Sequence, residues 1–504
     1  MWVIVIVLLI VTILAMEWIR KVRQYPPGPF PLPLIGNIHN IMLAKLQMKG
    51  IIDLMKVWQK EYGNVITIWL GPIPSVHLLD FETAKQEMLS NGAAYTDRFV
   101  PYMLDVRREG RGTAFSNGEF WADHRRFTLR TLRDFALKNS VMEERIMDEV
   151  TSNLYKLEKI MVNGQAKVKA NEFFDVIVGS VINRILFSES FTEENMAEYF
   201  AVKHRFDDMI NNSTALDMSL EKWTRNMPFL KKRWEALIKP QDDLLNFLRK
   251  RINQRKEDIA SGKHALDENG KDFVDAFFIK MEKDRREGKH PSQSYKEDEL
   301  LYDIFDLWIA GQETTTITLM WGMMHLIKNP DVMDKIRSEL IAITNSNRSI
   351  SLSDQDQAQY LNWTILEIHR LASILNLNLF RKTKEKGFVG GHHVPADTPI
   401  AAELTMIMND EKHFQEANKF DPERYARGGK ALEQRVIPFG LGKRSCIGET
   451  LAKAELFLIL ANLISRYDMA EDPEAPIDLK TSSPIGMMHR PKNFNIILKP
   501  TLWH

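Results

Sequence analysis

Cys446 has the clearest capacity for chemistry in this sequence, because it is the only cysteine and lies in the loop Phe439-Gly-Leu-Gly-Lys-Arg-Ser-Cys-Ile-Gly448. One thiol cannot form an intramolecular disulfide or a four-sulfur zinc site. The residues after Gly448 are predicted to form a helix, and the free N–H groups at a helix start favour an anion. That position is expected to lower the pKa of the thiol, and the thiolate is the form that binds metals. A lone cysteine is more often a buried structural residue, but the spacing of glycines and Arg444 favours a ligand.

A second unusual segment, residues 310–316, reads Ala-Gly-Gln-Glu-Thr-Thr-Thr and interrupts an apolar helix. Residues 300–309 are apolar on nearly every side apart from Asp303 and Asp306, which is typical of a buried helix. Gly311 and three consecutive threonines are poor helix formers. A local rule broken inside an element often marks a functional site. The alternative is a solvated patch between two apolar runs.

The loop around Cys446 resembles the haem-binding loop of the cytochrome P450 monooxygenases, whose pattern is Phe-Gly-x-Gly-x-Arg-x-Cys-x-Gly. The resemblance implies haem b, with Cys446 as the proximal iron ligand and with Phe439, Gly440 and Gly448 in the surrounding loop. Thiolate ligation supplies electron density to the iron and favours cleavage of the O–O bond.

The same resemblance implies that Ala310, Gly311, Glu313 and Thr314 lie above the haem. Gly311 is expected to leave room for dioxygen beside the iron. The Thr314 hydroxyl can donate and accept, and Glu313 is expected to bring protons from solvent, since reduction of bound oxygen to water requires protons.

The two propionates of a haem need cationic partners, and the sequence offers several. Trp121 and Arg125 match a Trp-x-x-x-Arg pattern of the family, and an indole N–H and a guanidinium both suit carboxylates. Arg444 in the cysteine loop is a further candidate. Arg98 and Arg381 are assigned from their spacing to Trp121 and Arg370, and a solvated surface arginine remains the alternative for both.

Glu367 and Arg370 stand at i and i+3, on one face of a predicted helix. Such a pair alone is common and usually exposed. The resemblance implies that they form a buried triad with Arg424, which follows the segment Phe420-Asp-Pro-Glu upstream of the cysteine loop. A buried triad would lock the core around that loop.

Two further sets of residues are assigned from family topology. The expected substrate pocket is lined by Phe99, Phe115, Phe206, Ile304, Leu375, Leu379 and Ile485, although each of these side chains suits core packing equally well. The expected contact surface for an electron-donor protein consists of Arg126, Arg130, Arg133 and Lys443, which otherwise form a solvated basic face.

The overall composition of the chain fits an enzyme with a large core. Its 504 residues carry 67 basic and 67 acidic side chains, and this balance gives no broad nucleic-acid footprint. We find no long linker or internal repeat. Helices are predicted near 81–90, 118–135, 141–162, 171–187, 222–257, 296–327 and 446–466, with a hairpin at 65–79 and a strand near 486–498. The predicted fold class is mainly α with small β-sheets (α+β), in one large helical domain, as the resemblance also implies.

The N-terminus is predicted to be a membrane anchor. Residues 1–19 are almost continuously apolar, which is just long enough to cross a bilayer. Basic residues follow at once, so the positive-inside rule places the remainder in the cytosol. A cleaved signal peptide is disfavoured, since a basic start and a clear cleavage site are missing. Residues 20–37 are interpreted as a basic and proline-rich hinge that forms a stiff spacer, and residues 38–504 as the catalytic domain.

The predicted function is therefore that of an animal microsomal type of cytochrome P450 in the endoplasmic reticulum membrane. The resemblance implies that one oxygen atom from O2 enters an apolar xenobiotic, fatty acid or steroid. Electrons would come from NADPH through a separate flavin reductase, with cytochrome b5 as a further candidate partner and membrane lipid around the anchor. Two alternatives are a thiolate-haem isomerase or dehydratase that uses no oxygen, and a non-catalytic membrane haem protein.

Overall fold

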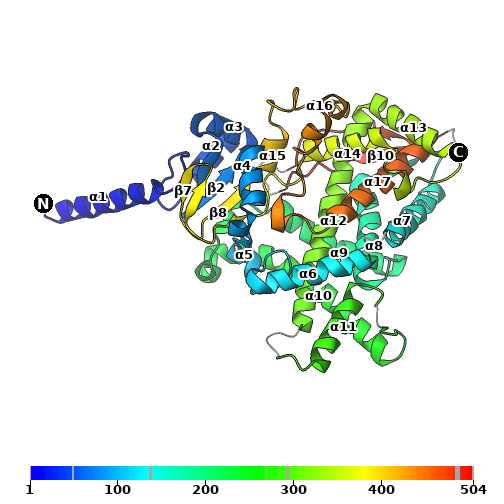
Figure 1. The fold of residues 1–504 in the computed structure, drawn as a ribbon, viewed down its shortest axis with the longest axis horizontal. Helices are drawn as coiled ribbons and strands as arrows, with labels where there is room; N and C mark the ends of the chain where they lie inside the picture. The colour runs from blue at the N-terminus through cyan, green and yellow to red at the C-terminus, as the bar shows by residue number, and fades with distance from the viewer. Residues whose placement is uncertain are drawn as a thin grey trace.

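The computed structural model describes residues 2–47, 50–135, 139–267, 270–290, 295–482 and 488–501. Within these ranges the chain is mainly helical with small sheets, which confirms the predicted fold class (Figure 1). The helices are α1 (Trp2–Val22), α2 (Ile38–Leu46), α3 (Ile51–Tyr62), α4 (Phe81–Lys85), α5 (Tyr102–Asp105), α6 (Gly118–Phe135), α7 (Asn139–Lys159), α8 (Ala170–Phe187), α9 (Glu193–Asn211), α10 (Lys231–Ala260), α11 (Phe273–Arg286), α12 (Glu297–Lys328), α13 (Pro330–Thr344), α14 (Gln359–Ala372), α15 (Leu404–Met408), α16 (Arg424–Glu433) and α17 (Glu449–Arg466).

Three sheets are formed by the described residues. The strands are β1 (Val65–Leu70), β2 (Ile73–Leu78), β3 (Asp97–Arg98), β4 (Ala166–Lys169), β5 (Arg381–Lys382), β6 (Gly387–Val389), β7 (His392–Val394), β8 (Pro399–Ala402), β9 (Tyr467–Glu471) and β10 (Asn495–Pro500). The largest sheet has the order β1-β2-β8-β5-β3. Its last pair is antiparallel and places Arg98 directly opposite Arg381. The sheet thus brings together two arginines that lie far apart in the sequence.

Helix α12 runs through the middle of the helical part of the molecule, where α8, α10, α14 and α17 contact it (Figure 1). The Glu299 side chain accepts a hydrogen bond from the Lys296 N–H at its start, and acidic residues in the first turn suit the helix dipole. Most of its side chains from Leu300 to Leu326 are buried in the largest core cluster. The apolar pattern of this segment is therefore satisfied by burial on all sides.

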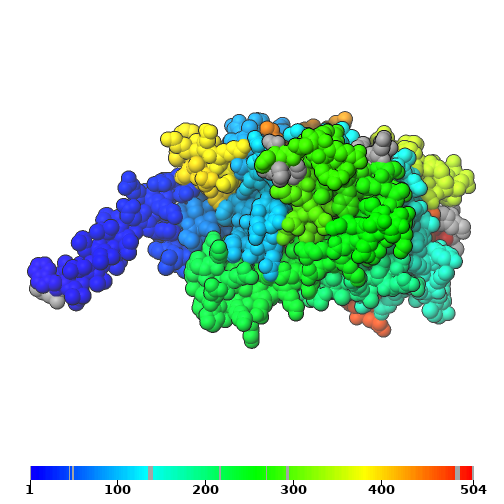
Figure 2. Space-filling model, turned by 90° about the horizontal axis from the view of Figure 1, so that it is seen from below, coloured from blue at the N-terminus to red at the C-terminus, as the bar shows by residue number. Residues whose placement is uncertain are grey.

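The N-terminal helix differs from the prediction in its end and in its connection to the rest of the chain. Helix α1 continues to Val22, and none of its residues is buried, so it projects from the body of the molecule (Figure 2). It is the one helix of the described residues that is long and apolar enough to cross a membrane. The ring of Trp18 lies 5.0 Å from that of Trp69 in β1, and its indole N–H donates to Pro31.

The proline-rich segment contacts the edge of the largest sheet. The Thr67 N–H donates to the Pro27 carbonyl at 2.9 Å. A Cβ atom at Gly28 would lie 2.2 Å from the Thr67 oxygen, so only glycine permits this approach. The proline-rich segment thus uses backbone partners at the edge of the sheet, while its predicted role as a hinge between the anchor and the catalytic domain stays a prediction.

Helix α10 also departs from the prediction, which placed a continuous helix over residues 222–257. Residues Lys222–Asn226 and Pro228–Leu230 form short 3-10 turns, and the long helix begins only at Lys231. Pro228 has no N–H to donate and therefore disfavours a helix that continues from Lys222 through it, although α10 itself contains Pro240. Trp223 and Phe229 in these turns are exposed.

Candidate functional site

The cysteine loop is held in a tight conformation that depends on glycine. Gly440 and Gly442 both adopt positive φ, at 71° and 72°, which L-residues rarely do. A Cβ atom at Gly442 would lie 1.9 Å from the Met88 carbonyl oxygen. The Cys446 N–H donates to the Phe439 carbonyl at 2.9 Å and closes the loop. The conformation therefore presents Cys446 just ahead of α17, whose first helical residue is Glu449.

The Cys446 side chain is accessible, although its surroundings are those of a protein interior. The residue counts as exposed, yet burial is the main cause that raises the pKa of its thiol. A hydrogen bond with the Gly448 backbone and the charge of Arg125 act in the opposite direction. The prediction that the helix start lowers this pKa is wrong for the polypeptide alone, because desolvation outweighs it. An accessible side chain in a desolvated place is suited to a bound ligand.

Buried cations surround the cysteine loop. Arg125 on α6 donates to the Ser445 carbonyl at 2.7 Å. Arg444 is buried, donates to Thr96 O at 2.6 Å, and lies 3.7 Å above the ring of Trp121. Both contacts connect the loop to the helix that carries the Trp-x-x-x-Arg pattern.

Arg98 and Arg381 join this group from the sheet, and both are buried instead of solvated. Arg98 donates to Leu379 O at 2.5 Å, and Arg381 donates to Leu441 O. Burial and the charge of Arg125 lower the pKa of Arg381 to about 10 and that of Arg444 to about 9. Burial, followed by repulsion from Arg444 and other arginines, also lowers the pKa of Arg98. Burial and mutual repulsion both disfavour the charged form of these arginines, and a bound anionic group would favour it.

Several buried donors in the same place have no hydrogen-bond partner. They are Trp121 Nε1, Arg381 Nε and Arg444 Nη1. An unpartnered buried donor is costly, so native structures rarely keep one without a reason. The group of donors and cations therefore fits a ligand that carries carboxylates.

On α12 the predicted residues divide between two environments. Ala310 is exposed within an otherwise buried helix, and Thr314 is partly exposed, with its hydroxyl donating to Ala310 O at 2.7 Å. Gly311 faces another way, because a Cβ atom there would lie 2.3 Å from Ile182 Cδ1 on α8. Gly311 was expected to leave room for dioxygen. The space left by its absent side chain, however, faces Ile182 on α8. Its smallness instead lets α8 approach α12.

Glu313 is buried in a group of charged residues and does not reach solvent. Its carboxylate binds Lys203 of α9 at 2.5 Å and also Arg490. Lys203 contacts Asp207 as well, at 2.7 Å, and Asp175 of α8 at 3.4 Å. Burial would raise the pKa of Glu313, but the two cations lower it to about 2. Two cations therefore enclose the Glu313 carboxylate, and its expected role in bringing protons from solvent stays a prediction.

Glu367, Arg370 and Arg424 form the buried triad that the resemblance implied. Arg370 donates to both Glu367 oxygens at 2.9 Å, and Arg424 donates to one of them at 2.9 Å. The Tyr425 hydroxyl adds a bond to Glu367 at 3.0 Å. Arg370 also donates to the carbonyls of Met408 and Ala417. The triad thus ties α14 to the chain that leads into the cysteine loop.

The residues expected to line the pocket occupy different depths. Phe206 and Ile304 belong to the main core cluster. The side chains of Phe99, Phe115, Leu375 and Leu379 are partly exposed. Ile485 lies outside the described residues. The proposed partner surface is accessible, since Arg126, Arg130, Arg133 and Lys443 are all exposed.

Sequence reasoning missed three buried residues near these elements, namely His124, Glu455 and Lys203. His124 on α6 contacts Asp303 on α12, and Glu455 on α17 accepts a hydrogen bond from Thr315 at 3.3 Å. Burial raises the pKa of Glu455 to about 8. The available signal was a charged residue inside an apolar helix, which Asp303 and Glu455 both show. Lys203 gave no comparable signal.

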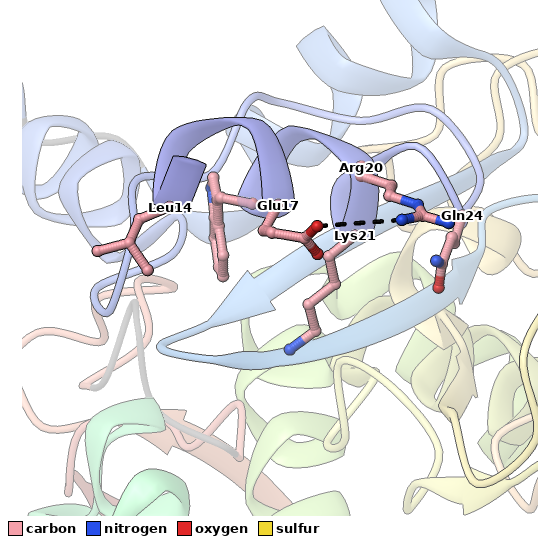
Figure 3. Close-up of a pocket in the computed structure, with 6 residues that line it drawn as sticks. Leu14, Glu17, Arg20, Lys21 and Gln24 are labelled. Carbon is pink, nitrogen blue, oxygen red and sulfur yellow. Dashed lines mark ion pairs between the residues drawn. The ribbon is translucent and has the colours of Figure 1, made fainter. Parts of the chain in front are cut away.

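A hollow at the base of α1 lies apart from these groups. It is lined by Leu14, Glu17, Trp18, Arg20, Lys21 and Gln24, which come from α1 and the turn after it (Figure 3). Glu17 and Arg20 are 3.9 Å apart and exposed. The hollow contains none of the predicted catalytic residues.

Comparison with known proteins connects the site to a large family. The family model described as Cytochrome P450 matches residues 26–498. "Probable cytochrome P450 cyp-35D1" of Caenorhabditis elegans is 37% identical over 470 residues, covering 92% of this chain and 93% of the relative. "Cytochrome P450 2C70" of Mus musculus is 31% identical, with 94% of each chain covered. "Cytochrome P450 2U1" of Homo sapiens is 28% identical, with 97% of this chain and 92% of the relative covered.

The residues present fit the haem that this family binds. A thiolate-ligated haem needs one axial sulfur and partners for its two propionates. Cys446 supplies an accessible sulfur, and the unpartnered donors of Trp121, Arg381 and Arg444 suit carboxylates. Within the described residues no group of three or more His, Cys, Asp or Glu side chains could hold a metal ion. The residues around Cys446 fit a prosthetic group that is held by one thiolate.

Proposed function

The chain belongs to the cytochrome P450 family and is a haem-thiolate monooxygenase, and on this basis we propose that it oxidises an apolar xenobiotic, fatty acid or steroid. One oxygen atom of O2 enters the substrate and the other leaves as water. Electrons come from NADPH through a separate flavin reductase. The observation that carries the proposal is the set of buried, mutually repelling arginines and unpartnered donors around one accessible thiol.

The roles of the chain's own residues follow from their positions. Cys446 would hold the haem iron through its sulfur, and a haem held in this way would supply oxygen activation, because thiolate ligation favours O–O cleavage. Trp121, Arg125, Arg98, Arg381 and Arg444 are the proposed partners of the two propionates. Phe439 and Gly448 lie next to Cys446. The Phe439 carbonyl accepts the hydrogen bond from the Cys446 N–H. A Cβ atom at Gly448 would lie 4.0 Å from Cys446 Sγ.

Proton delivery is assigned to Thr314 on the accessible side of α12. Its hydroxyl holds a bond to Ala310 O at 2.7 Å and can rotate to donate to a ligand beside it. Glu313 can take part only after its carboxylate leaves Lys203 and Arg490. Ala310, which is exposed next to Thr314, is the proposed wall of the oxygen site.

Exposed surfaces support the proposed partner and the proposed location. The exposed residues Arg126, Arg130, Arg133 and Lys443 form the proposed docking surface for the acidic face of a reductase, since complementary charge steers association. The apolar helix α1 suggests anchoring in the endoplasmic reticulum membrane. We further propose a single membrane pass, with the catalytic domain in the cytosol.

The test is a carbon-monoxide difference spectrum of the reduced full-length protein. We expect a strongly red-shifted Soret band in the wild type and its loss in Cys446→Ser. NADPH-dependent oxygen uptake with reductase, together with product formation on a lipid and drug panel, then separates a monooxygenase from an isomerase or a carrier. An unchanged band in Cys446→Ser would overturn the ligand assignment, and an oxidised product without oxygen uptake would overturn the reaction.

A further inference from the structure

His124 lies on α6 between the two residues of the Trp-x-x-x-Arg pattern, three positions after Trp121 and one before Arg125. It is buried, with 3% of its surface exposed. Trp121 and Arg125 face the cysteine loop through Arg444 and Ser445. Any contact that fixes His124 therefore fixes the turn of α6 that presents these two side chains.

The two ring nitrogens of His124 meet two carboxylates of α12. Nδ1 lies 2.6 Å from Asp303 Oδ2, and Nε2 lies 3.6 Å from Glu299 Oε2. Only the doubly protonated imidazolium can present a donor to both. Burial on its own would lower the pKa of His124, but these two carboxylates raise it to about 9. His124 is thus a buried cation at neutral pH.

Aromatic rings hold the plane of the imidazole. Phe120 stacks on one side at 4.0 Å, and Tyr295 stacks on the other at 4.6 Å with an angle of 7° between the planes. The Tyr295 hydroxyl donates to Asp123 of α6 at 2.8 Å, and Lys280 of α11 lies over the Tyr295 ring at 4.4 Å. The ring therefore cannot turn away from Asp303 without breaking several contacts.

Asp303 also holds the segment before α6. Its other oxygen accepts a hydrogen bond from Thr113 at 2.6 Å. Three residues later the Ser116 carbonyl accepts a bond from Arg444 at 2.7 Å. The Asp303 carboxylate on α12 therefore contacts both α6, through His124, and the segment that leads into α6, through Thr113.

We propose that His124, through its link to Asp303, is a positioning residue that keeps Trp121 and Arg125 in place to hold the haem propionates. This assignment rests on the proposed function, since it concerns the same site. The groups that face His124 are Asp303 and Glu299 from α12, Asp123 from its own helix, and Tyr295 with Lys280 behind it.

The test measures the release of haem from the full-length protein to excess apomyoglobin, with the Soret band as the signal. His124→Gln keeps a donor but removes the charge, and Asp303→Asn removes the partner charge with little change of shape. The matched control is His325→Gln, because His325 is also buried and stacks on Phe420 at 4.9 Å. Loss of a residue that supports a ligating group typically costs about ten- to a hundredfold in affinity.

We expect His124→Gln and Asp303→Asn each to release haem about ten- to a hundredfold faster than the wild type, and His325→Gln to stay close to it. In the wild type, haem release should accelerate as the pH rises through about 9. This step should be smaller in His124→Gln than in the wild type, and the remainder should come from Arg444, whose pKa is also lowered to about 9. Should either variant not fold, the other variant and the pH series decide.

Two results would overturn the assignment. The first is release at the wild-type rate in both variants. The second is equal acceleration of haem release in all three variants, with a pH step in His124→Gln as large as that of the wild type, which would mean general loosening of the fold. A wild-type protein that retains no haem would instead refute the proposed function, so the two failures are distinguishable.

Discussion

Replacing Gly311 by Ala tests whether this glycine serves helix packing or the oxygen site. The new Cβ would lie 2.3 Å from Ile182 Cδ1 and 2.9 Å from its Cγ1. Carbon atoms prefer separations of about 3.5–4.0 Å, so the overlap is substantial. Overpacking of a core costs about 1–3 kcal/mol, and Ala regains about 1 kcal/mol of helix propensity. We therefore expect a net loss of about 0–2 kcal/mol in the free energy of unfolding.

A second substitution, Ile182→Val, removes the Cδ1 atom that lies nearest to the new Cβ of Gly311→Ala. Ile182→Val lacks Cδ1 and should cost about 0.5–1.5 kcal/mol by itself. In the double variant most of the clash disappears, so the loss should be smaller than the sum of the two single losses by about 1–2 kcal/mol. Urea denaturation of the four proteins, followed by tryptophan fluorescence, supplies the cycle.

Additive losses would refute the packing explanation, because they would show that the two side chains do not meet. The coupling of oxygen uptake to product formation supplies the functional readout. If Gly311→Ala lowers this coupling and the addition of Ile182→Val does not restore it, Gly311 acts on the oxygen site. Relief of the stability loss and of the coupling defect together would place the effect in the contact between α8 and α12.

Three other substitutions give sharp outcomes. Glu367→Ala leaves the fully buried Arg370 without its partner and should lower the free energy of unfolding by about 3–5 kcal/mol; a loss below about 1 kcal/mol in urea denaturation would contradict a buried triad. Gly442→Ala meets the Met88 carbonyl at 1.9 Å with φ at 72° and should abolish the red-shifted carbon-monoxide band, whereas a normal band would show that the loop tolerates a side chain. Burial raises the pKa of Glu455 in the folded protein from 4.5 to about 8. The neutral carboxyl group is compatible with folding, so the stability is highest below the ordinary pKa of 4.5 and decreases as the pH rises from there toward 8. The melting temperature of Glu455→Gln should therefore fall less than that of the wild type as the pH rises over this interval. Parallel curves of melting temperature against pH for the two proteins would contradict the assignment.

Local sequence determined the cysteine loop and the general architecture. The glycine, arginine and cysteine spacing around Cys446 is a property of ten consecutive residues, and its tight turn follows from the positive φ that glycine alone adopts easily. The same holds for α12, whose apolar run predicts burial, and for α1, whose length and composition predict an anchor. In each case the signal and the structure lie within one element.

Only the tertiary structure decided which distant side chains meet. Arg98 and Arg381 became neighbours because β3 pairs with β5, and a surface position had been an equal expectation. Gly311 gained its meaning from Ile182 on another helix. Glu313 received Lys203 and Arg490 as partners from segments far away in sequence, and these two cations enclose its carboxylate. Charge and steric effects depend on distance in space, and spacing along the chain fixes such distances only within a helix turn or a strand pair.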